Sequence, residues 1–275
     1  MARLGSKPWL LGLLGDDRVY RSPSPFMHET ALKSCLAEGR YLPLSLTSDN
    51  IEIALKGLFA LGFSGLNVTA PHKRAVMPFL ESLSLEAEKI GAVNTLLPGL
   101  KSFRGFNTDH LGFSEAYLTG LNPSQALVIG SGGAARAVLQ ALNSKGFKPT
   151  VASRNLVKGY EIAKQFEANF IDFNNIRSFG PWPLAVNASS ASSPEELGPN
   201  PPLIGLRPGS VMVDVNYGRQ KNVWRDQALK SEAVFKDGLG MLALQARESF
   251  KIWTSLDPGA DCFLSSLENF TGHKT

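Results

Sequence analysis

The alternation of apolar runs and amphipathic segments along the chain indicates an α/β fold. In the first part of the chain, short apolar runs bounded by turn residues predict strands, and apolar residues at helical spacing predict helices. The expected strands are 9–14, 42–46 and 65–68, the expected helices are 26–37, 50–61 and 74–90, and 92–97 with 101–106 form a hairpin. We expect Ser24 as the N-cap of the first helix, with Pro25 at its first helical position.

From about residue 110 onward the alternation becomes regular. The expected strands are 126–129, 149–153, 184–187 and 211–215, and the expected helices are 134–144, 156–166 and 240–253. Such a series of strand–helix–strand units implies a parallel sheet. The segment 189–209 is rich in Pro, Gly and Ser and is therefore predicted as a loop.

The composition is that of an ordinary globular enzyme. Of the 275 residues, 43% are apolar and 19% are charged, which is usual for one large or two medium soluble domains. The net charge of +4 favours anionic small molecules, but the basic residues are scattered and indicate no nucleic-acid partner. No spacing of His, Cys or carboxylate residues indicates a metal site.

Cysteine usage and hydropathy indicate a cytoplasmic protein. Cys35 and Cys262 are too few for a disulfide framework, and we expect both in the core of a protein from a reducing compartment. The apolar run 9–14 is too short for a signal peptide, and Asp16 and Asp17 follow it at once. No stretch approaches the roughly 20 apolar residues of a membrane span.

The stretch ALVIGSGGAARAV carries a G-x-G-x-x-A pattern between a predicted strand and a predicted helix. Gly130 allows the tight turn, Gly132 lets the backbone approach a pyrophosphate, and Ala135 permits close helix–strand packing. The free N–H groups at the helix start hold phosphate charge. Because strand, turn and helix follow in the required order, the pattern predicts a dinucleotide site.

The residues after the second strand of this region indicate which dinucleotide binds. An NAD site usually has Asp or Glu there, for the ribose 2′-hydroxyl. This chain has Ser153 and Arg154, with Lys158 one turn later. Two cations without a carboxylate favour a 2′-phosphate, which predicts NADP. The alternative is that Arg154 is simply a solvated residue after a strand.

Polar residues gather after several of the predicted apolar runs. GLNVTAPHKRAV places Asn67, Thr69, His72 and Lys73 directly after a buried strand. Ser22 and Ser24 stand at a helix start, where hydroxyl and N–H groups suit a carboxylate. Further polar positions are Asn94, Asn107, Thr108, Asp109 and Gln245. Because ligands of open α/β sheets bind at strand ends, this pattern favours a site for a polyhydroxy molecule.

Six motifs in fixed order make the chain similar to the shikimate dehydrogenase family, which includes quinate/shikimate dehydrogenases. They are S-x-S-P, N-V-T-x-P-x-K, G-A-V-N-T, N-T-D-x-x-G-F, G-x-G-G-A-A-R and D-G-L-G-M-L-x-x-Q-A, running from near Ser22 to Thr254. The resemblance implies two α/β domains: a substrate domain, 1–109 completed by about 239–275, and an NADP-binding Rossmann domain, 110–238. The C-terminal helix returns to the first domain.

The resemblance also implies a reaction and a set of partners. The family reversibly reduces 3-dehydroshikimate to shikimate with NADPH, in the route to chorismate and the aromatic amino acids. The partner is then a small hydroxy acid, with neither nucleic acid nor membrane involved, and the protein is a monomer or homodimer.

Matching motifs carry the family's site residues onto this chain. Lys73 and Asp109 become the catalytic pair, and Ser22 and Ser24 bind the substrate carboxylate. The substrate hydroxyls are held by Thr69, Asn94, Asp109 and Gln245, with Tyr217 lining the pocket, and Asn67 supports the strand end. The implied cofactor contacts are Gly130, Ser131, Gly132, Gly133, Ala134, Ala135, Ser153, Arg154, Lys158, Asn187, Val215 and Gly238.

The residue types suit this chemistry. Hydride transfer to a ketone leaves an alkoxide that must be protonated, and an ammonium beside a carboxylate can supply the proton. The plainer interpretations are a solvated lysine at position 73, a helix-capping Asp109, and turn or cap serines at 22 and 24. We expect His72 to be structural or surface-facing, and His28 and His110 to be non-catalytic.

Three positions depart from the family pattern. Arg21 replaces the usual His before the first serine, Glu29 replaces a common Asn, and Tyr217 is followed by GRQKN without the Pro and Thr of Y-x-P-x-x-T. These changes leave open a paralogue acting on quinate or another cyclic hydroxy acid. A second alternative is a nucleotide-binding homologue with weak turnover, against which the presence of both Lys73 and Asp109 argues.

Overall fold

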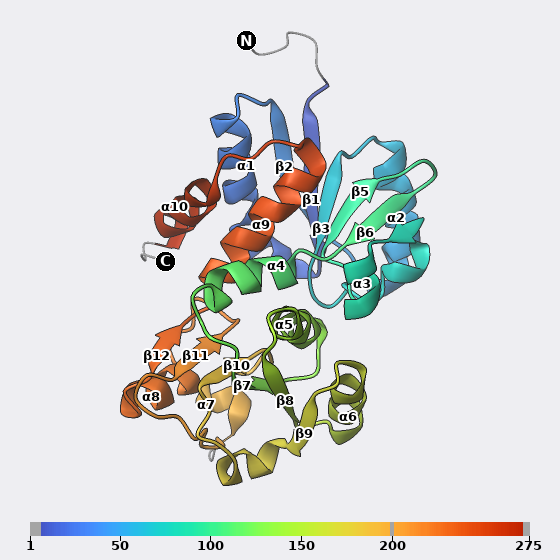
Figure 1. Cartoon of the computed structure of the whole chain (residues 1–275). Helices are drawn as coiled ribbons and strands as arrows, with labels where there is room; N and C mark the ends of the chain where they lie inside the picture. Colours follow the sequence, from blue (N-terminus) through green and yellow to red (C-terminus); the bar gives the residue numbers. More distant parts are fainter. Residues whose placement is uncertain (1–6, 199–200, 272–275) are drawn as a thin grey trace. The chain divides into compact units, whose positions relative to one another are not determined.

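The chain forms two compact units in a computed structural model that describes residues 7–198 and 201–271 (Figure 1). Among these residues, the first unit comprises 7–112 and 242–271, and the second comprises 113–198 and 201–241. The outer ends of the predicted substrate domain, 1–6 and 272–275, and residues 199–200 of the predicted loop lie outside the described residues.

The first unit contains a mixed sheet with strand order β2-β1-β3-β5-β6-β4. Its strands are β1 (Trp9–Gly15), β2 (Gly39–Ser45), β3 (Gly65–Val68), β4 (Ser82–Leu83), β5 (Thr95–Pro98) and β6 (Phe103–Phe106). β1 runs parallel to both β2 and β3, whereas β5 runs antiparallel to β3 and β6. Because the chain continues from β1 to β2 on one side and to β3 on the other, the carboxyl end of β1 is the place where an α/β sheet binds ligands.

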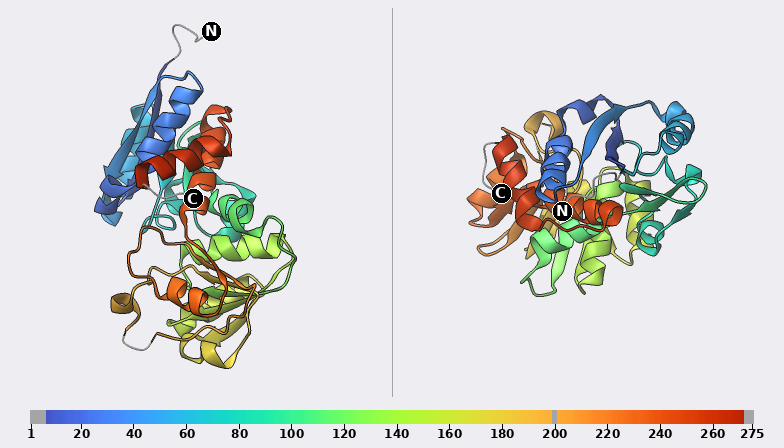
Figure 2. Two further views of the ribbon diagram at one scale, coloured as in Figure 1. Left: turned by 90° about the vertical axis from the view of Figure 1, so that its left-hand side faces the viewer. Right: turned by 90° about the horizontal axis from the view of Figure 1, so that it is seen from above.

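Helices from both ends of the chain complete the first unit. They are α1 (Ser24–Ser34), α2 (Ile51–Ala60), α3 (Leu85–Ile90), α9 (Leu239–Thr254) and α10 (Ala260–Thr271), with 3-10 turns η1 (Asp17–Arg21), η2 (Ser48–Asn50) and η3 (Met77–Phe79). α10 lies against α1 (Figures 1 and 2), where Phe26 and Phe270 are in ring contact. Trp253 of α9 reaches the sheet, since its indole N–H donates to the Leu96 carbonyl at 2.9 Å.

The second unit is built on an all-parallel sheet with strand order β12-β11-β10-β7-β8-β9. Its strands are β7 (Gln125–Ile129), β8 (Lys148–Ser153), β9 (Asn169–Asp172), β10 (Leu184–Asn187), β11 (Val211–Asp214) and β12 (Val234–Lys236). Numbered from β7, this is the 3-2-1-4-5-6 order of the Rossmann fold, in which the order reverses between β7 and β10.

Two separate cores cover the two faces of this sheet. Along β7, Ala126 and Val128 join one core, whereas Leu127 and Ile129 join the other, as the alternation of side chains in a strand requires. The first core includes α5 (Gly133–Ser144) and α6 (Leu156–Gln165), and the second includes α8 (Val223–Lys230) and η5 (Phe173–Ser178). The remaining elements are α7 (Pro194–Leu197), α4 (Asp109–Phe113) and a π turn, Ser114–Leu118.

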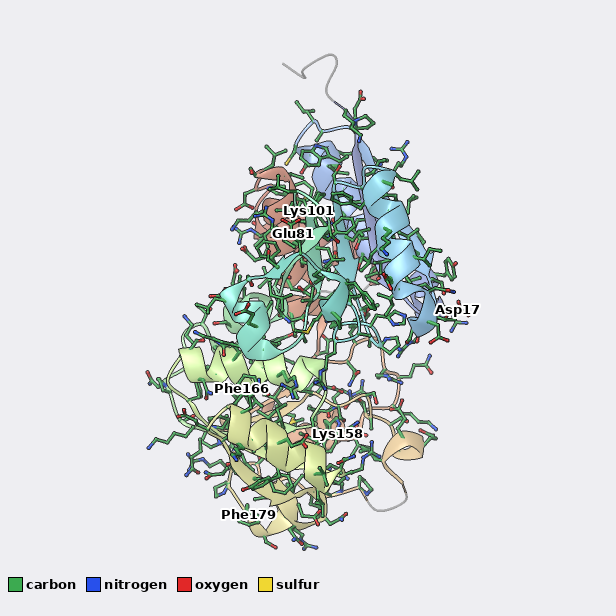
Figure 3. The ribbon with its side chains drawn as sticks, turned by 90° about the vertical axis from the view of Figure 1, so that its right-hand side faces the viewer. Asp17, Glu81, Lys101, Lys158, Phe166 and Phe179 are labelled. Carbon is green, nitrogen blue, oxygen red and sulfur yellow. The ribbon has the colours of Figure 1, made fainter. Side chains whose placement is uncertain are left out.

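Several sequence predictions need correction. The helix predicted over 74–90 is limited to α3, because Pro78 lies in a 3-10 turn and Ser82–Leu83 pairs with β6. Glu81 stabilises this segment by accepting hydrogen bonds from the backbone N–H groups of Lys101 and Ser102 at 2.8 and 3.1 Å (Figure 3). The segment 189–209 is not entirely a loop, because Ser193 and Glu196 form a capping box that starts α7.

The start of α1 and the two cysteines also differ from expectation. Pro23 is the N-cap and Ser24 the first helical residue, and the helix ends at Ser34 rather than at 37. Cys35 and Cys262 are half-buried rather than in the core, because they lie where α1 meets α10, and the Ser34 hydroxyl is 3.6 Å from the Cys262 sulfur. Helices α8 and α10 and strands β9 and β12 are among the elements that the sequence did not predict.

Candidate active site

A lysine and an aspartate form an ion pair at the strand ends of the first unit. The Lys73 ammonium donates to Asp109 Oδ2 at 2.6 Å, and the side chains are 21% and 6% exposed. Lys73 follows β3 through a turn, and its carbonyl accepts the Val93 N–H at 2.8 Å, which fixes the backbone from which the ammonium projects. Asp109 begins α4, where the helix N-terminus favours negative charge. An ammonium held in this way can donate a proton to a nearby oxygen and then recover it.

Asn94 joins this ion pair to helix α9. Its amide nitrogen donates to Asp109 Oδ1 at 3.0 Å, to the Thr108 hydroxyl at 2.8 Å and to Gln245 Oε1 at 3.1 Å. Its amide oxygen accepts the Thr108 N–H at 2.8 Å. We call Lys73, Asn94, Thr108, Asp109 and Gln245 the polar cluster. The structure thus brings together four of the predicted site residues with Thr108, which the sequence already marked as a polar position.

A second layer of polar side chains supports the polar cluster, and of its members only Asn67 was predicted from the sequence. Asn67 donates to the Asn94 carbonyl and to the Ser249 hydroxyl, both at 3.0 Å, and accepts the Tyr41 hydroxyl at 2.8 Å. Ser249 lies one turn after Gln245 on α9, and this i,i+4 spacing could have indicated it. Asn67 therefore supports the strand end, as expected, and links it to β2.

The two serines form a pair at the start of α1. The Ser22 hydroxyl lies 3.0 Å from the Ser24 hydroxyl and accepts the Ser24 N–H at 3.2 Å. Ser22 is half-buried and Ser24 is buried. Thr69 is half-buried directly after β3, and Gly15 at the end of β1 has room for no side chain, because a Cβ there would stand 2.6 Å from the Thr69 methyl group. The carboxyl ends of β1 and β3 thus lie side by side.

His28, His72 and His110 all lie outside the polar cluster. His72 is buried and its ring nitrogens face the Leu46 carbonyl at 3.0 Å and the Ser48 hydroxyl at 3.5 Å, so its contacts are structural. His28 stacks on Tyr41, and burial lowers its pKa to about 3, so it is neutral near pH 7. Burial also lowers the pKa of His110.

In the second unit, the glycine turn Gly130–Ala135 lies at the reversal of strand order. Gly130 has φ +123°, and a Cβ there would stand 2.9 Å from the Ala188 carbonyl, so only glycine fits between β7 and the loop after β10. Gly132 is the N-cap of α5 and has no heavy atom within 4 Å of its Cβ position. Gly133 and Ala134 open α5, and Ala135 is fully buried. The turn therefore combines free space with exposed N–H groups, as a phosphate site requires.

The end of β8 carries the residues predicted to select the dinucleotide. The buried Ser153 hydroxyl donates to the Ser131 hydroxyl of the glycine turn at 3.1 Å. Arg154 and Lys158 are exposed, and no carboxylate stands between Ser153 and Lys158. An Arg154 guanidinium nitrogen lies 3.5 Å from the Glu196 carbonyl, which brings it beside α7. Figure 3 labels Lys158 on α6.

The other predicted cofactor residues, Asn187, Val215 and Gly238, lie at or just after the ends of β10, β11 and β12. Val215 N–H donates to the Asn187 carbonyl at 3.0 Å, and Gly238 N–H donates to the Asn216 carbonyl at 3.1 Å. Gly238 must be glycine, because a Cβ there would collide with the Val215 carbonyl. Tyr217, predicted to line the substrate pocket, belongs to the loop after β11 in the second unit and is 37% exposed.

The described residues contain neither a cluster suited to a metal ion nor a helix suited to span a membrane. Within 7–198 and 201–271, no group of three or more His, Cys, Asp or Glu side chains is arranged to hold a metal ion. Among the helices of the same residues, none has the length and apolar character needed to cross a membrane.

Known proteins resemble the chain over nearly its whole length. Residues 13–96 match the shikimate dehydrogenase substrate binding domain, and residues 114–182 match shikimate / quinate 5-dehydrogenase. A shikimate dehydrogenase (NADP(+)) of Methanococcus maripaludis is 33% identical over 269 residues, which cover 93% of this chain and 95% of that protein. The chain belongs to the shikimate dehydrogenase family. The resemblance inferred from its motifs is thereby confirmed.

Solved structures of the shikimate dehydrogenase family share the fold. Shikimate 5-dehydrogenase from Thermus thermophilus, in complex with NADP(H) and shikimate, has a TM-score of 0.85 at 32% identity, with 95% of this chain and 99% of that chain covered. Quinate dehydrogenase from Corynebacterium glutamicum, in complex with NAD, has a TM-score of 0.86 at 26% identity, with 96% and 100% covered. The predicted α/β class, with a Rossmann-like sheet and a C-terminal helix on α1, is therefore confirmed.

Proposed function

We propose that the chain is an NADP-dependent shikimate dehydrogenase, an oxidoreductase that reversibly reduces 3-dehydroshikimate to shikimate. The observation that carries this proposal is the Lys73–Asp109 ion pair, held by Asn94 and Gln245, in a chain that matches shikimate dehydrogenases over its full length. The first unit serves as the substrate domain and the second as the NADP-binding domain.

Lys73 is the proton donor in the direction of ketone reduction. NADPH, when bound, supplies the hydride that converts the carbonyl carbon to an alcohol carbon. The Lys73 ammonium, 2.6 Å from Asp109 Oδ2, stabilises the negative charge that develops on the former carbonyl oxygen and gives it a proton. Asp109 keeps the ammonium in place, and Asn94 holds the second carboxylate oxygen. In the oxidation direction the same pair accepts the proton.

The remaining polar residues of the first unit orient the substrate. Ser22 and Ser24 present two hydroxyls at the start of α1, which suits the substrate carboxylate. Thr69, Asn94, Asp109 and Gln245 bind the ring hydroxyls. Holding the ring in one orientation contributes to the rate, because hydride transfer requires a short, aligned contact.

The second unit offers a site that fits NADP. The glycine turn Gly130–Ala135 with the α5 N-terminus holds the pyrophosphate, and Asn187, Val215 and Gly238 face the cofactor from the neighbouring strand ends. Ser153, Arg154 and Lys158 hold the 2′-phosphate, because cationic donors without a carboxylate favour a phosphate over a hydroxyl.

A four-way spectrophotometric assay tests this function. Turnover is followed at the NADPH or NADH absorbance band with shikimate or quinate and with NADP or NAD. We expect the largest kcat/KM for shikimate with NADP. If none of the four combinations gives turnover, the enzyme proposal is contradicted and a binding protein is favoured.

Quinate is the second candidate substrate. The quinate dehydrogenase of Corynebacterium glutamicum shares the fold, and the exposed Arg21 beside Ser22 is a departure at the carboxylate end of the proposed site. Glu29 is engaged elsewhere, because its carboxylate accepts the Tyr41 N–H at 3.3 Å. A much larger kcat/KM for quinate than for shikimate would favour this candidate.

Arg154→Ala is expected to weaken NADPH binding selectively. Loss of a charged hydrogen bond to the 2′-phosphate should raise the KM for NADPH by roughly 10- to 100-fold, with little change for NADH, which lacks that phosphate. Steady-state kinetics with both cofactors measure the two effects. Lys164→Ala, an exposed cation in the last turn of α6, is the control. An equal effect on both cofactors would rule out the phosphate role of Arg154.

A further inference from the structure

Asp214, the last residue of β11, is a fully buried carboxylate with hydrogen-bond donors on both oxygens. Its Oδ2 accepts the Ser192 hydroxyl at 2.6 Å and the Asn222 amide at 2.7 Å. Its Oδ1 accepts the Asn187 amide at 2.9 Å, the Asn216 amide at 2.9 Å and the Asn216 N–H at 3.1 Å. The side chain has 0% exposure, so these donors replace water completely.

These donors come from three separate segments around the ends of β10 and β11 (Figure 1). Asn187 and Ser192 belong to the end of β10 and the loop that follows it. Asn216 belongs to the loop after β11, and Asn222 is the N-cap of α8. While its amide nitrogen donates to Asp214, the amide oxygen of Asn222 accepts the N–H groups of Trp224 and Arg225, both at 3.0 Å. One carboxylate therefore fixes two loops and a helix start.

The fixed loops in turn hold Ser189 beside the glycine turn. Asn187 Oδ1 accepts the Ser189 hydroxyl at 2.7 Å and the Ser189 N–H at 3.2 Å, and the Asn216 amide donates to the Ser189 carbonyl at 2.8 Å. Ser189 N lies 3.0 Å from the Cβ position of Gly130, so this loop forms one wall of the turn. Both amides that hold Ser189 are themselves oriented by Asp214.

We propose that Asp214 is a positioning residue for the cofactor site. It orients Asn187 and Asn216 so that the backbone at Ser189 and Val215 keeps its place against the glycine turn. This inference rests on the proposed function only in assigning NADP(H) to that site. Asp214 itself touches no reacting atom.

The arrangement predicts the effect of two related variants. Asp214→Asn retains an acceptor toward Asn187 and Asn216 but sets an NH₂ group against the NH₂ group of Asn222. Exchanging the two residues, in Asp214→Asn with Asn222→Asp, restores a donor facing an acceptor. Asp is as good an N-cap as Asn, so α8 keeps its start, and the Ser192 hydroxyl can donate or accept.

Fluorescence titration of the full chain with NADPH, without substrate, tests the inference. We expect Asp214→Asn to raise the Kd by roughly tenfold and the exchange variant to return it close to the wild-type value. Asp226→Asn, the same change at an exposed position of α8, should bind as the wild type does. Steady-state kinetics in the oxidation direction should show a similar rise in the KM for NADP, with the KM for shikimate unchanged.

The outcomes separate this inference from the proposed function. Unchanged NADPH affinity in folded Asp214→Asn, or an exchange variant as weak as the single variant, would overturn the positioning role. Failure of the wild-type chain to bind NADPH would instead overturn the proposed function. If Asp214→Asn does not fold, Ser192→Ala replaces it, since it removes one donor, and we expect a rise in Kd of roughly two- to tenfold; an unchanged Kd there would likewise overturn the inference.

Discussion

Lys73→Ala is expected to lower kcat by roughly 10²–10⁴-fold, the usual contribution of a general acid or base. The variant removes the ammonium that lies 2.6 Å from Asp109 Oδ2 and leaves the other hydrogen bonds of the polar cluster in place. The KM for shikimate should change much less than kcat, because Asn94, Gln245 and the two serines still bind the substrate. Initial rates at saturating shikimate and NADP measure the effect.

Arg74→Ala is the matched control for Lys73→Ala. Arg74 is the next residue in the chain, carries the same charge and is exposed. Arg74→Ala removes one positive charge, as Lys73→Ala does. A difference between the two variants therefore cannot come from a weaker general attraction of anions. A wild-type kcat in Lys73→Ala would refute a specific proton-transfer role for Lys73. An equal decrease of kcat in Arg74→Ala would refute it as well.

Asp109→Asn is expected to lower kcat by roughly 10²-fold or more. The amide cannot balance the charge of the Lys73 ammonium, and its NH₂ group meets a donor on one side, because Lys73 and Asn94 both donate to the native carboxylate at 2.6 and 3.0 Å. The half-buried ammonium then loses its counter-charge, so we also expect a lower melting temperature. Kinetics and a thermal unfolding scan measure the two effects separately.

Asp261→Asn, an exposed carboxylate near the start of α10 in the same unit, is the control for this change. It should leave both kcat and the melting temperature near the wild-type values. A kcat for Asp109→Asn close to wild type in a folded protein would mean that Asp109 only caps α4. In that case Lys73 would act without the carboxylate.

The residues predicted from motifs could be found because each stands beside a recognisable strand end or glycine turn. Lys73 follows the buried strand β3, Asn94 directly precedes β5, and Gly130 stands between a strand and a helix. The contacts that these residues make with one another could not be predicted from local sequence patterns. Asn67 contacts Ser249 across 182 positions of sequence, and only the completed fold brings such residues together.

One misjudged region and one overlooked residue show where local pattern fails. The apolar spacing in 74–90 suits a helix, but Pro78 and the pairing of Ser82–Leu83 with β6 decide the conformation. Asp214 looks like any carboxylate after a strand, and its importance comes from donors on three other segments. Tertiary contacts of this kind leave no periodic trace in the sequence.

The first unit is assembled from both ends of the chain, and this has a consequence for synthesis. Trp253 of α9 occupies the space over Gly65, and Ser249 completes the hydrogen bonds of Asn67. The second unit is continuous in sequence and is synthesised before most of α9 and all of α10. The strands β1, β2 and β3 are synthesised early, but their core can close only after the last helices have been made.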